Sequence, residues 1–108
     1  MEAHAHVLVA NDPPTYREML GSELPLLRPR LTVLLVDPAD LDEAMARMRP
    51  RLVICSELTD SVRQYANAAI VLYPDGRNQA ILDIAGAQQV LPNPAVSDLL
   101  AAIDAATA

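Results

Sequence analysis

The sequence contains no lysine, no phenylalanine and no tryptophan, and it has one cysteine and three glycines among 108 residues. Because lysine is absent, all eight basic residues are arginines, and the net charge is −6. Nucleic acids and anionic membranes are bound largely through basic residues, so we expect neither as a partner. The single cysteine, Cys55, excludes an internal disulfide and a multi-cysteine metal site.

Long hydrophobic runs are also absent, since no apolar run approaches the roughly 20 residues of a membrane span. The first six residues are not basic and lead directly into an apolar run, so we expect no signal peptide. The expected location is therefore the cytoplasm. The length of 108 residues and the hydrophobic content of 52% predict one domain over residues 1–108 with a core of its own.

Short apolar runs alternate five times with segments of helical character. The predicted strands are Val7–Ala10, Leu31–Val36, Leu52–Cys55, Ala69–Tyr73 and Gln88–Leu91. The predicted helices cover residues 15–27, 38–48, 60–65 and 78–85 and a segment after Pro94, with Gly86 ending the fourth. This alternation predicts an α/β fold in which a parallel sheet carries helices on both faces.

The segment Leu52–Cys55 directs attention to a possible site. Four apolar residues, partly β-branched, predict a strand buried on both faces, with Cys55 as a small core residue. Ser56 follows at the carboxyl end of this strand. Ligands of open α/β sheets bind at that edge, so Ser56 is the first candidate site residue.

Three segments carry a resemblance to a known family. They are His6-Val-Leu-Val-Ala-Asn-Asp12, Arg49-Pro-Arg-Leu-Val-Ile-Cys-Ser56 and Gly86-Ala-Gln-Gln-Val-Leu-Pro-Asn-Pro94. On these segments the chain resembles a response-regulator receiver domain, the phosphoacceptor module of two-component signalling. The resemblance implies a flavodoxin-like (βα)5 three-layer sandwich with a parallel five-stranded sheet of order 2-1-3-4-5. The third helix is shorter than the family pattern.

The resemblance also places the family's working residues on this sequence. The acidic pair that holds magnesium falls on Asn11 and Asp12, and the phosphoaccepting aspartate falls on Ser56. The switch threonine or serine falls on Tyr73, and the lysine that pairs with the phosphoryl group falls on Asn93.

These replacements remove the groups that phosphoryl transfer requires. An acyl phosphate needs a carboxylate nucleophile, a divalent metal and a compensating cation. Asp12 alone remains as a weak metal ligand, so we expect no cofactor and no bound Mg²⁺. The sequence therefore indicates a degenerate receiver, or pseudo-receiver, that is not an enzyme.

Several of these residues also have simpler interpretations. Asp12 and Asn93 each precede a proline, which is typical of a helix cap. Glu57, which follows Ser56, is a further candidate, because its carboxylate is a possible stand-in for a phosphorylated aspartate. Strand alternation, however, directs it away from Ser56. Tyr73 either fills part of the emptied pocket or is a half-exposed tyrosine at a strand end.

The resemblance implies contact with a protein partner or a second copy through the fourth helix, the fifth strand and the fifth helix. The residues predicted for this interaction face are Arg77, Ile81, Val90, Ala101, Ala102 and Ala105. The leading hypothesis is a stand-alone domain that acts in a phosphorelay through phosphorylation-independent contacts, either as a homodimer or with a protein partner. Two alternatives stay open. One is a receiver that still responds through Ser56 modification or anion binding, and the other is a small flavodoxin-like cofactor binder or enzyme.

Overall fold

The computed structural model describes residues 5–74, 77–84 and 86–107. Within these ranges the strands are β1 (Ala5–Ala10), β2 (Leu31–Leu35), β3 (Leu52–Cys55), β4 (Ala68–Leu72), β5 (Gln79–Ile84) and β6 (Ala87–Pro92). The α-helices are α1 (Pro14–Leu27), α2 (Leu41–Met48), α3 (Asp60–Tyr65) and α4 (Val96–Thr107). A 3₁₀ turn, Pro38–Asp40, precedes α2, and the Asp37 carboxylate caps it by accepting from the Ala39 amide.

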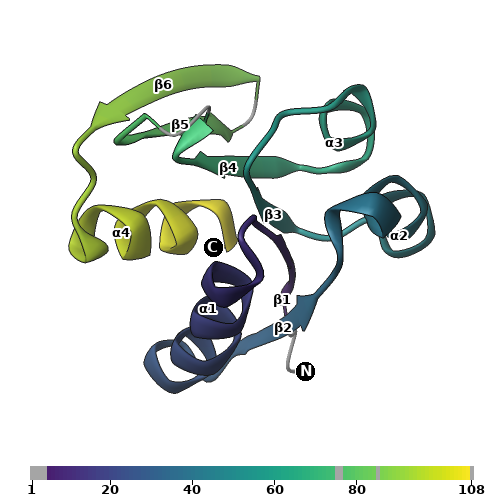
Figure 1. Ribbon diagram of the computed structural model, residues 1–108, viewed down its shortest axis with the longest axis horizontal. Helices are drawn as coiled ribbons and strands as arrows, with labels where there is room; N and C mark the ends of the chain where they lie inside the picture. The colour runs from purple at the N-terminus through teal and green to yellow at the C-terminus, as the bar shows by residue number, and fades with distance from the viewer. Residues whose placement is uncertain (1–4, 75–76, 85, 108) are drawn as a thin grey trace.

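The strands form one mixed sheet of order β2-β1-β3-β4-β5-β6 (Figure 1). Strands β2, β1, β3 and β4 are parallel, and β5 and β6 each run antiparallel to the preceding strand. The α/β class is confirmed, and the first four strands stand in the order 2-1-3-4. The sheet as a whole is six-stranded and mixed, so the fully parallel five-stranded sheet is not what the structure contains.

The difference arises at residues 78–84, where the predicted fourth helix is wrong. This segment forms β5, with Ala80 and Leu82 buried on one face of the sheet and Ile81 directed to the other. Ile84 pairs with Ala87, so β5 and β6 form a hairpin. Gly86 adopts a φ of +81° in the connection and does not end a helix.

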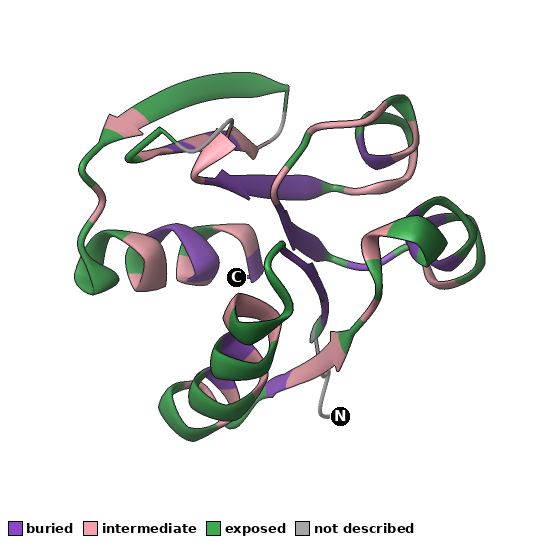
Figure 2. Ribbon diagram, in the orientation of Figure 1, coloured by how far each residue is buried: buried purple, intermediate pink, exposed green. Residues whose placement is uncertain are grey.

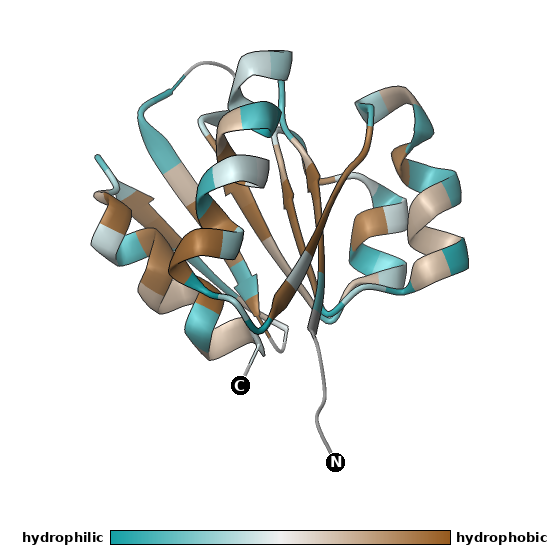
Figure 3. Cartoon of the chain, turned by 90° about the horizontal axis from the view of Figure 1, so that it is seen from below, coloured by the Kyte–Doolittle hydropathy of each residue, from teal (hydrophilic) through white to brown (hydrophobic). Residues whose placement is uncertain are grey.

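Helices cover both faces of the sheet, as Figures 2 and 3 show. Helices α1 and α4 pack on one face and α2 and α3 on the other, each over a separate group of buried side chains. The third helix is short, as expected, with six residues, and the Thr59 hydroxyl caps it by accepting from the Val62 amide. Cys55 is 1% exposed, and this burial raises its pKa to about 12, which confirms it as a core residue.

Helix α1 is continuous despite Pro25, and it approaches β2 closely at Gly21. A Cβ atom at position 21 would lie 2.8 Å from Cδ2 of Leu35. The missing side chain therefore lets the helix backbone lie against the edge strand. Among the described residues, no helix combines the length and apolar character needed to cross a membrane.

Candidate functional site

The first candidate site lies where β1 and β3 end. Asp12 follows β1, Ser56 follows β3, and these strands are neighbours in the sheet. The backbone N–H of Asp12 donates a hydrogen bond to Oγ of Ser56 at 2.9 Å. The structure therefore brings these two predicted residues together, and the Ser56 hydroxyl serves as an acceptor for the main chain.

The carboxylate of Asp12 points elsewhere. It is 62% exposed and accepts from the Arg17 guanidinium at 3.4 Å. It does not cap α1, because Pro13 occupies the cap position and makes no side-chain cap bond. The helix-cap interpretation of Asp12 is therefore wrong.

The neighbouring residue Asn11 is 2% exposed. Its Oδ1 atom has no hydrogen-bond partner among the described residues. A buried polar atom without a partner costs about 1–3 kcal/mol. A second carboxylate at this position would be costlier still, because burial disfavours charge.

Asn93 lies away from this pair. Strands β4 and β5 separate β6 from β3, so the carboxyl end of β6 is three strand spacings, roughly 14 Å, from that of β3. Asn93 has a φ of +47° and is bonded to Asn78, whose Nδ2 donates to its Oδ1 at 2.8 Å. It does not cap α4, because the Asp98 carboxylate accepts from the Ala95 amide at the start of that helix.

A cleft of about 420 Å³ adjoins Ser56. Its described lining residues are Ser56, Glu57, Leu58, Val71, Pro74 and Ile81. Glu57 is the one charged residue among them, and none is basic, so the lining provides no cation for an anion. Within the described part of the chain, no group of three His, Cys, Asp or Glu side chains is placed to hold a metal.

Tyr73 follows β4 and has a φ of +53°, a conformation that is strained for a residue with a bulky side chain. Its ring packs against the Tyr16 ring with a centroid distance of 5.4 Å and an interplanar angle of 31°. Burial raises the pKa of the Tyr73 hydroxyl, and the neighbouring Tyr16 adds to this effect. Tyr73 thus belongs to the face of the sheet that carries α1 and α4 and does not line the Ser56 cleft.

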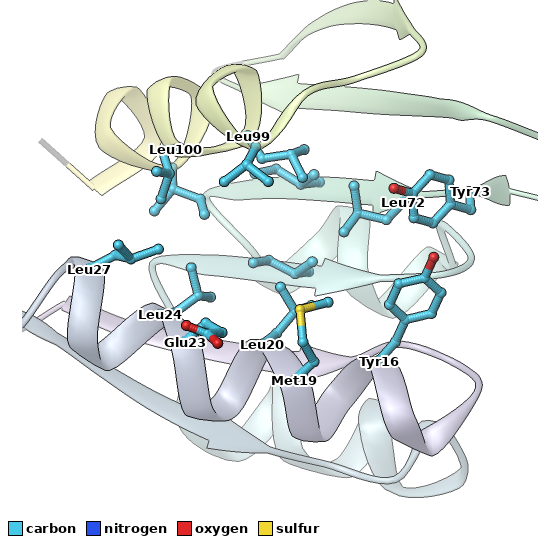
Figure 4. A pocket seen from close by; sticks show the side chains of 14 residues that line it. Tyr16, Met19, Leu20, Glu23, Leu24, Leu27, Leu72, Tyr73, Leu99 and Leu100 are labelled. Carbon is cyan, nitrogen blue, oxygen red and sulfur yellow. The ribbon is translucent and has the colours of Figure 1, made fainter.

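A second cavity, of about 340 Å³, lies between α1 and α4 over strands β3 and β4 (Figure 4). We call it the α1/α4 pocket, and it is lined by Tyr16, Met19, Leu20, Glu23, Leu24, Leu27, Ile54, Ile70, Leu72, Tyr73, Val96, Leu99, Leu100 and Ile103. A sealed, empty cavity of this volume would cost on the order of 8 kcal/mol, which is most of the stability of a small domain. Consistently, the pocket is open to solvent, with Met19, Leu27 and Val96 partly exposed.

Sequence reasoning did not find this pocket. The residues that α1 contributes recur at helical spacing and were interpretable only as a face that packs on the sheet. Nothing in the sequence indicated that α4 would stand apart from α1 on the same face.

The residues of the predicted interaction face fall on two sides of the sheet. Ile81 pairs with Val90 across the hairpin and is half-buried against the core group that α2 and α3 cover. Val90 is 52% exposed, and Arg77 is exposed just before β5. Helix α4 packs on the opposite face, so the predicted residues do not form one continuous surface.

The alanines of α4 that were predicted for the interaction face differ in their exposure to solvent. Ala101 and Ala105 are exposed, as predicted. Ala102 is 6% exposed and belongs to the core with Ile103, so its predicted outward orientation is wrong. Residues three and four apart share one face of a helix, so the stripe through Leu99 and Ile103 also takes in Ala102 and Ala106.

Comparison with known proteins returned no match to any family model, any curated protein or any solved structure.

Proposed function

We propose that this chain is a receiver-like domain that acts in phosphorelay signal transduction through phosphorylation-independent protein contacts. It derives from the flavodoxin-like plan of receivers, with the fourth helix replaced by β5. Its cellular location in this proposal is the cytoplasm. The resemblance over three segments of the sequence and the parallel arrangement of the first four strands support this origin.

One observation supports the proposal that the contacts of this domain do not depend on phosphorylation. The residue at the phosphoacceptor position, Ser56, is bonded to the Asp12 main chain, and the residue at the lysine position, Asn93, is separated from it by two strands. In the receiver plan the fifth strand lies next to the fourth. Here β5 lies between β4 and β6, so the strand that precedes Asn93 is one strand farther from β3. Nucleophile, metal ligand and cation therefore do not converge on one phosphoryl group.

The contact surface in this proposal is β6, and the partner is a second copy of the chain. Strand β6 is an edge strand of six residues with an exposed Val90. An exposed edge strand is a template for pairing with another strand. No residue of Ala87–Pro92 is charged, so two copies of a chain with a net charge of −6 meet with little local repulsion there.

Sedimentation velocity of the wild type and two variants tests this proposal. Val90→Arg places a charge at an exposed position of β6, and Ala101→Arg places the same charge at an exposed position of α4. We expect a concentration-dependent dimer that Val90→Arg abolishes and Ala101→Arg preserves. A wild-type protein that stays monomeric, or a dimer that survives Val90→Arg, would contradict the proposed contact.

A further inference from the structure

The α1/α4 pocket borders the buried core of the sheet. Its floor includes Ile54 of β3 and Ile70 of β4, which are each 1% exposed. These residues belong to the two middle strands of the sheet, so the pocket extends inward between the helices. An α-helix with its side chains is roughly 10–12 Å wide, so even one turn of about 5.4 Å exceeds the pocket volume of about 340 Å³. The volume therefore favours a slender occupant over a docked helix.

The two ends of the pocket are held by different contacts. Helices α1 and α4 both begin at the edge where β1, β4 and β6 end, and there the Tyr16 and Tyr73 rings pack together. At the far end, the Arg28 guanidinium binds the Asp104 carboxylate at 2.7 and 2.9 Å. The ion pair thus joins the two helices at the far end, the ring contact holds the start of α1 to the end of β4, and the apolar space between the helices is preformed.

The polar groups of the pocket define its chemistry. Among the described lining residues, the polar side chains are Tyr16, Tyr73 and Glu23, and none is basic. Figure 4 shows the Tyr16 hydroxyl directed toward Tyr73 at one end of the pocket. A tyrosine hydroxyl both donates and accepts hydrogen bonds. Without a basic side chain in this lining, the pocket provides no cation for an anionic ligand.

We propose that the α1/α4 pocket binds a slender, uncharged apolar molecule that carries one hydroxyl or carbonyl group at its end. That head group hydrogen-bonds to Tyr16 and Tyr73. The apolar tail runs between the helices toward Leu24 and Leu100. From Tyr16 to Leu27, α1 rises about 16 Å, which sets the length available to the tail. The volume of about 340 Å³ lies within the usual range for ligand sites.

The strained backbone of Tyr73 fits this role. A left-handed φ of +53° is maintained in a tyrosine while its amide donates to the Gln79 carbonyl at 2.9 Å. Strain of this kind gathers at sites where a side chain must point in one direction. Here that direction brings the ring beside Tyr16 and the hydroxyl to the pocket.

The probe for the test is 1-octanol, with octanoate of the same chain length as the charged control. Backbone NMR titration of the full chain is expected to show saturable shifts at Leu20, Leu72, Tyr73 and Leu100. Octanoate is expected to bind at least roughly ten-fold more weakly, because its charge would be buried in an apolar pocket whose described lining provides no compensating cation. Absence of saturable shifts with 1-octanol, or equal binding of octanoate, would overturn the proposal.

Two tryptophan variants provide a matched pair. Leu100→Trp fills the pocket, whereas Leu26→Trp adds the same side chain at a residue of α1 that is 77% exposed and outside the lining. We expect Leu100→Trp to abolish octanol binding and Leu26→Trp to leave it unchanged. If Leu100→Trp does not fold, Leu27→Trp at the pocket mouth replaces it, with the same expected loss. Unchanged binding in the folded pocket variant would refute the site.

Two more measurements test the alternatives to a ligand pocket with a polar end. One alternative is a purely apolar cavity, and the other is an interface between copies of the chain. The double variant Tyr16→Phe with Tyr73→Phe keeps the rings and removes both hydroxyls, and we expect octanol binding to fall roughly ten-fold while a plain alkane of equal length binds unchanged. Shifts of the same amides on raising the protein concentration without octanol would instead assign the pocket to a second copy and overturn the proposal. Octanol binding does not depend on whether β6 forms a dimer.

Discussion

Arg28 at the end of α1 and Asp104 on α4 form a two-point ion pair, with Nε to Oδ1 at 2.7 Å and Nη2 to Oδ2 at 2.9 Å. Their sequence positions are 76 residues apart. The pair connects the two helices that enclose the α1/α4 pocket. The guanidinium hydrogen bond holds the pKa of Asp104 below its ordinary value and raises the pKa of Arg28.

Because the pKa of Asp104 is lower in the folded state than in the unfolded state, its contribution to stability is present above the unfolded pKa. It is lost as the pH falls through the folded pKa. We therefore expect Asp104→Asn to lower the free energy of unfolding at neutral pH and to match the wild type in strong acid. Urea unfolding at several pH values measures this. Glu43→Gln, which removes the exposed Arg47–Glu43 pair, is the control and should have little effect at any pH. A deficit of Asp104→Asn that is the same at all pH values would contradict the ion-pair account.

The two described glycines with defined surroundings should respond oppositely to alanine. At Gly21 the nearest atoms to the new methyl group belong to the side chain of Leu35, which is 47% exposed. We expect that side chain to shift, and alanine favours the helix by up to about 1 kcal/mol. At Gly86 the φ of +81° strains alanine, which costs about 1 kcal/mol. Thermal unfolding of both variants measures these effects. A lower unfolding temperature for Gly21→Ala would show that Leu35 of β2 cannot shift to make room for the methyl group.

Restoring the family's charged residues should not restore phosphorylation. Ser56→Asp with Asn93→Lys supplies a carboxylate and an ammonium, but the strand order keeps the two positions roughly 14 Å apart. After incubation with acetyl phosphate and magnesium, intact-mass spectrometry should show no added phosphoryl group. Ser56→Asp alone is the matched control. A phosphorylated double variant would show that the inserted strand leaves the phosphoryl site intact.

The first four strands were predictable because each is a short apolar run bounded by clear turn or capping residues. Leu52–Cys55 is the best case, since its burial on both faces follows directly from its composition. The prediction of a helix over residues 78–84 was wrong because an apolar run this short fits both a helix and a strand. The alternation of Ala80, Leu82 and Ile84 and the single turn glycine at position 86 were the available signals for a hairpin.

The candidate site was predictable only in part. The parallel strands bring Asp12 and Ser56 together, as expected for residues that end adjacent strands. Asn93 was misplaced because its position depends on the number of strands before it. The contacts of Tyr16 with Tyr73 and of Arg28 with Asp104 join residues far apart in the sequence, and no local pattern encodes such pairs.

The most direct test of the central claim is a backbone NMR titration with magnesium, repeated with beryllium fluoride as a phosphoryl mimic. If the partner contacts of this domain are phosphorylation-independent, the NMR signals of the Asp12, Ser56 and Asn93 amides should not shift under either condition. Joint shifts of these three amides that spread to Tyr73 and α4 would show a working phosphoryl switch. That result would contradict the account.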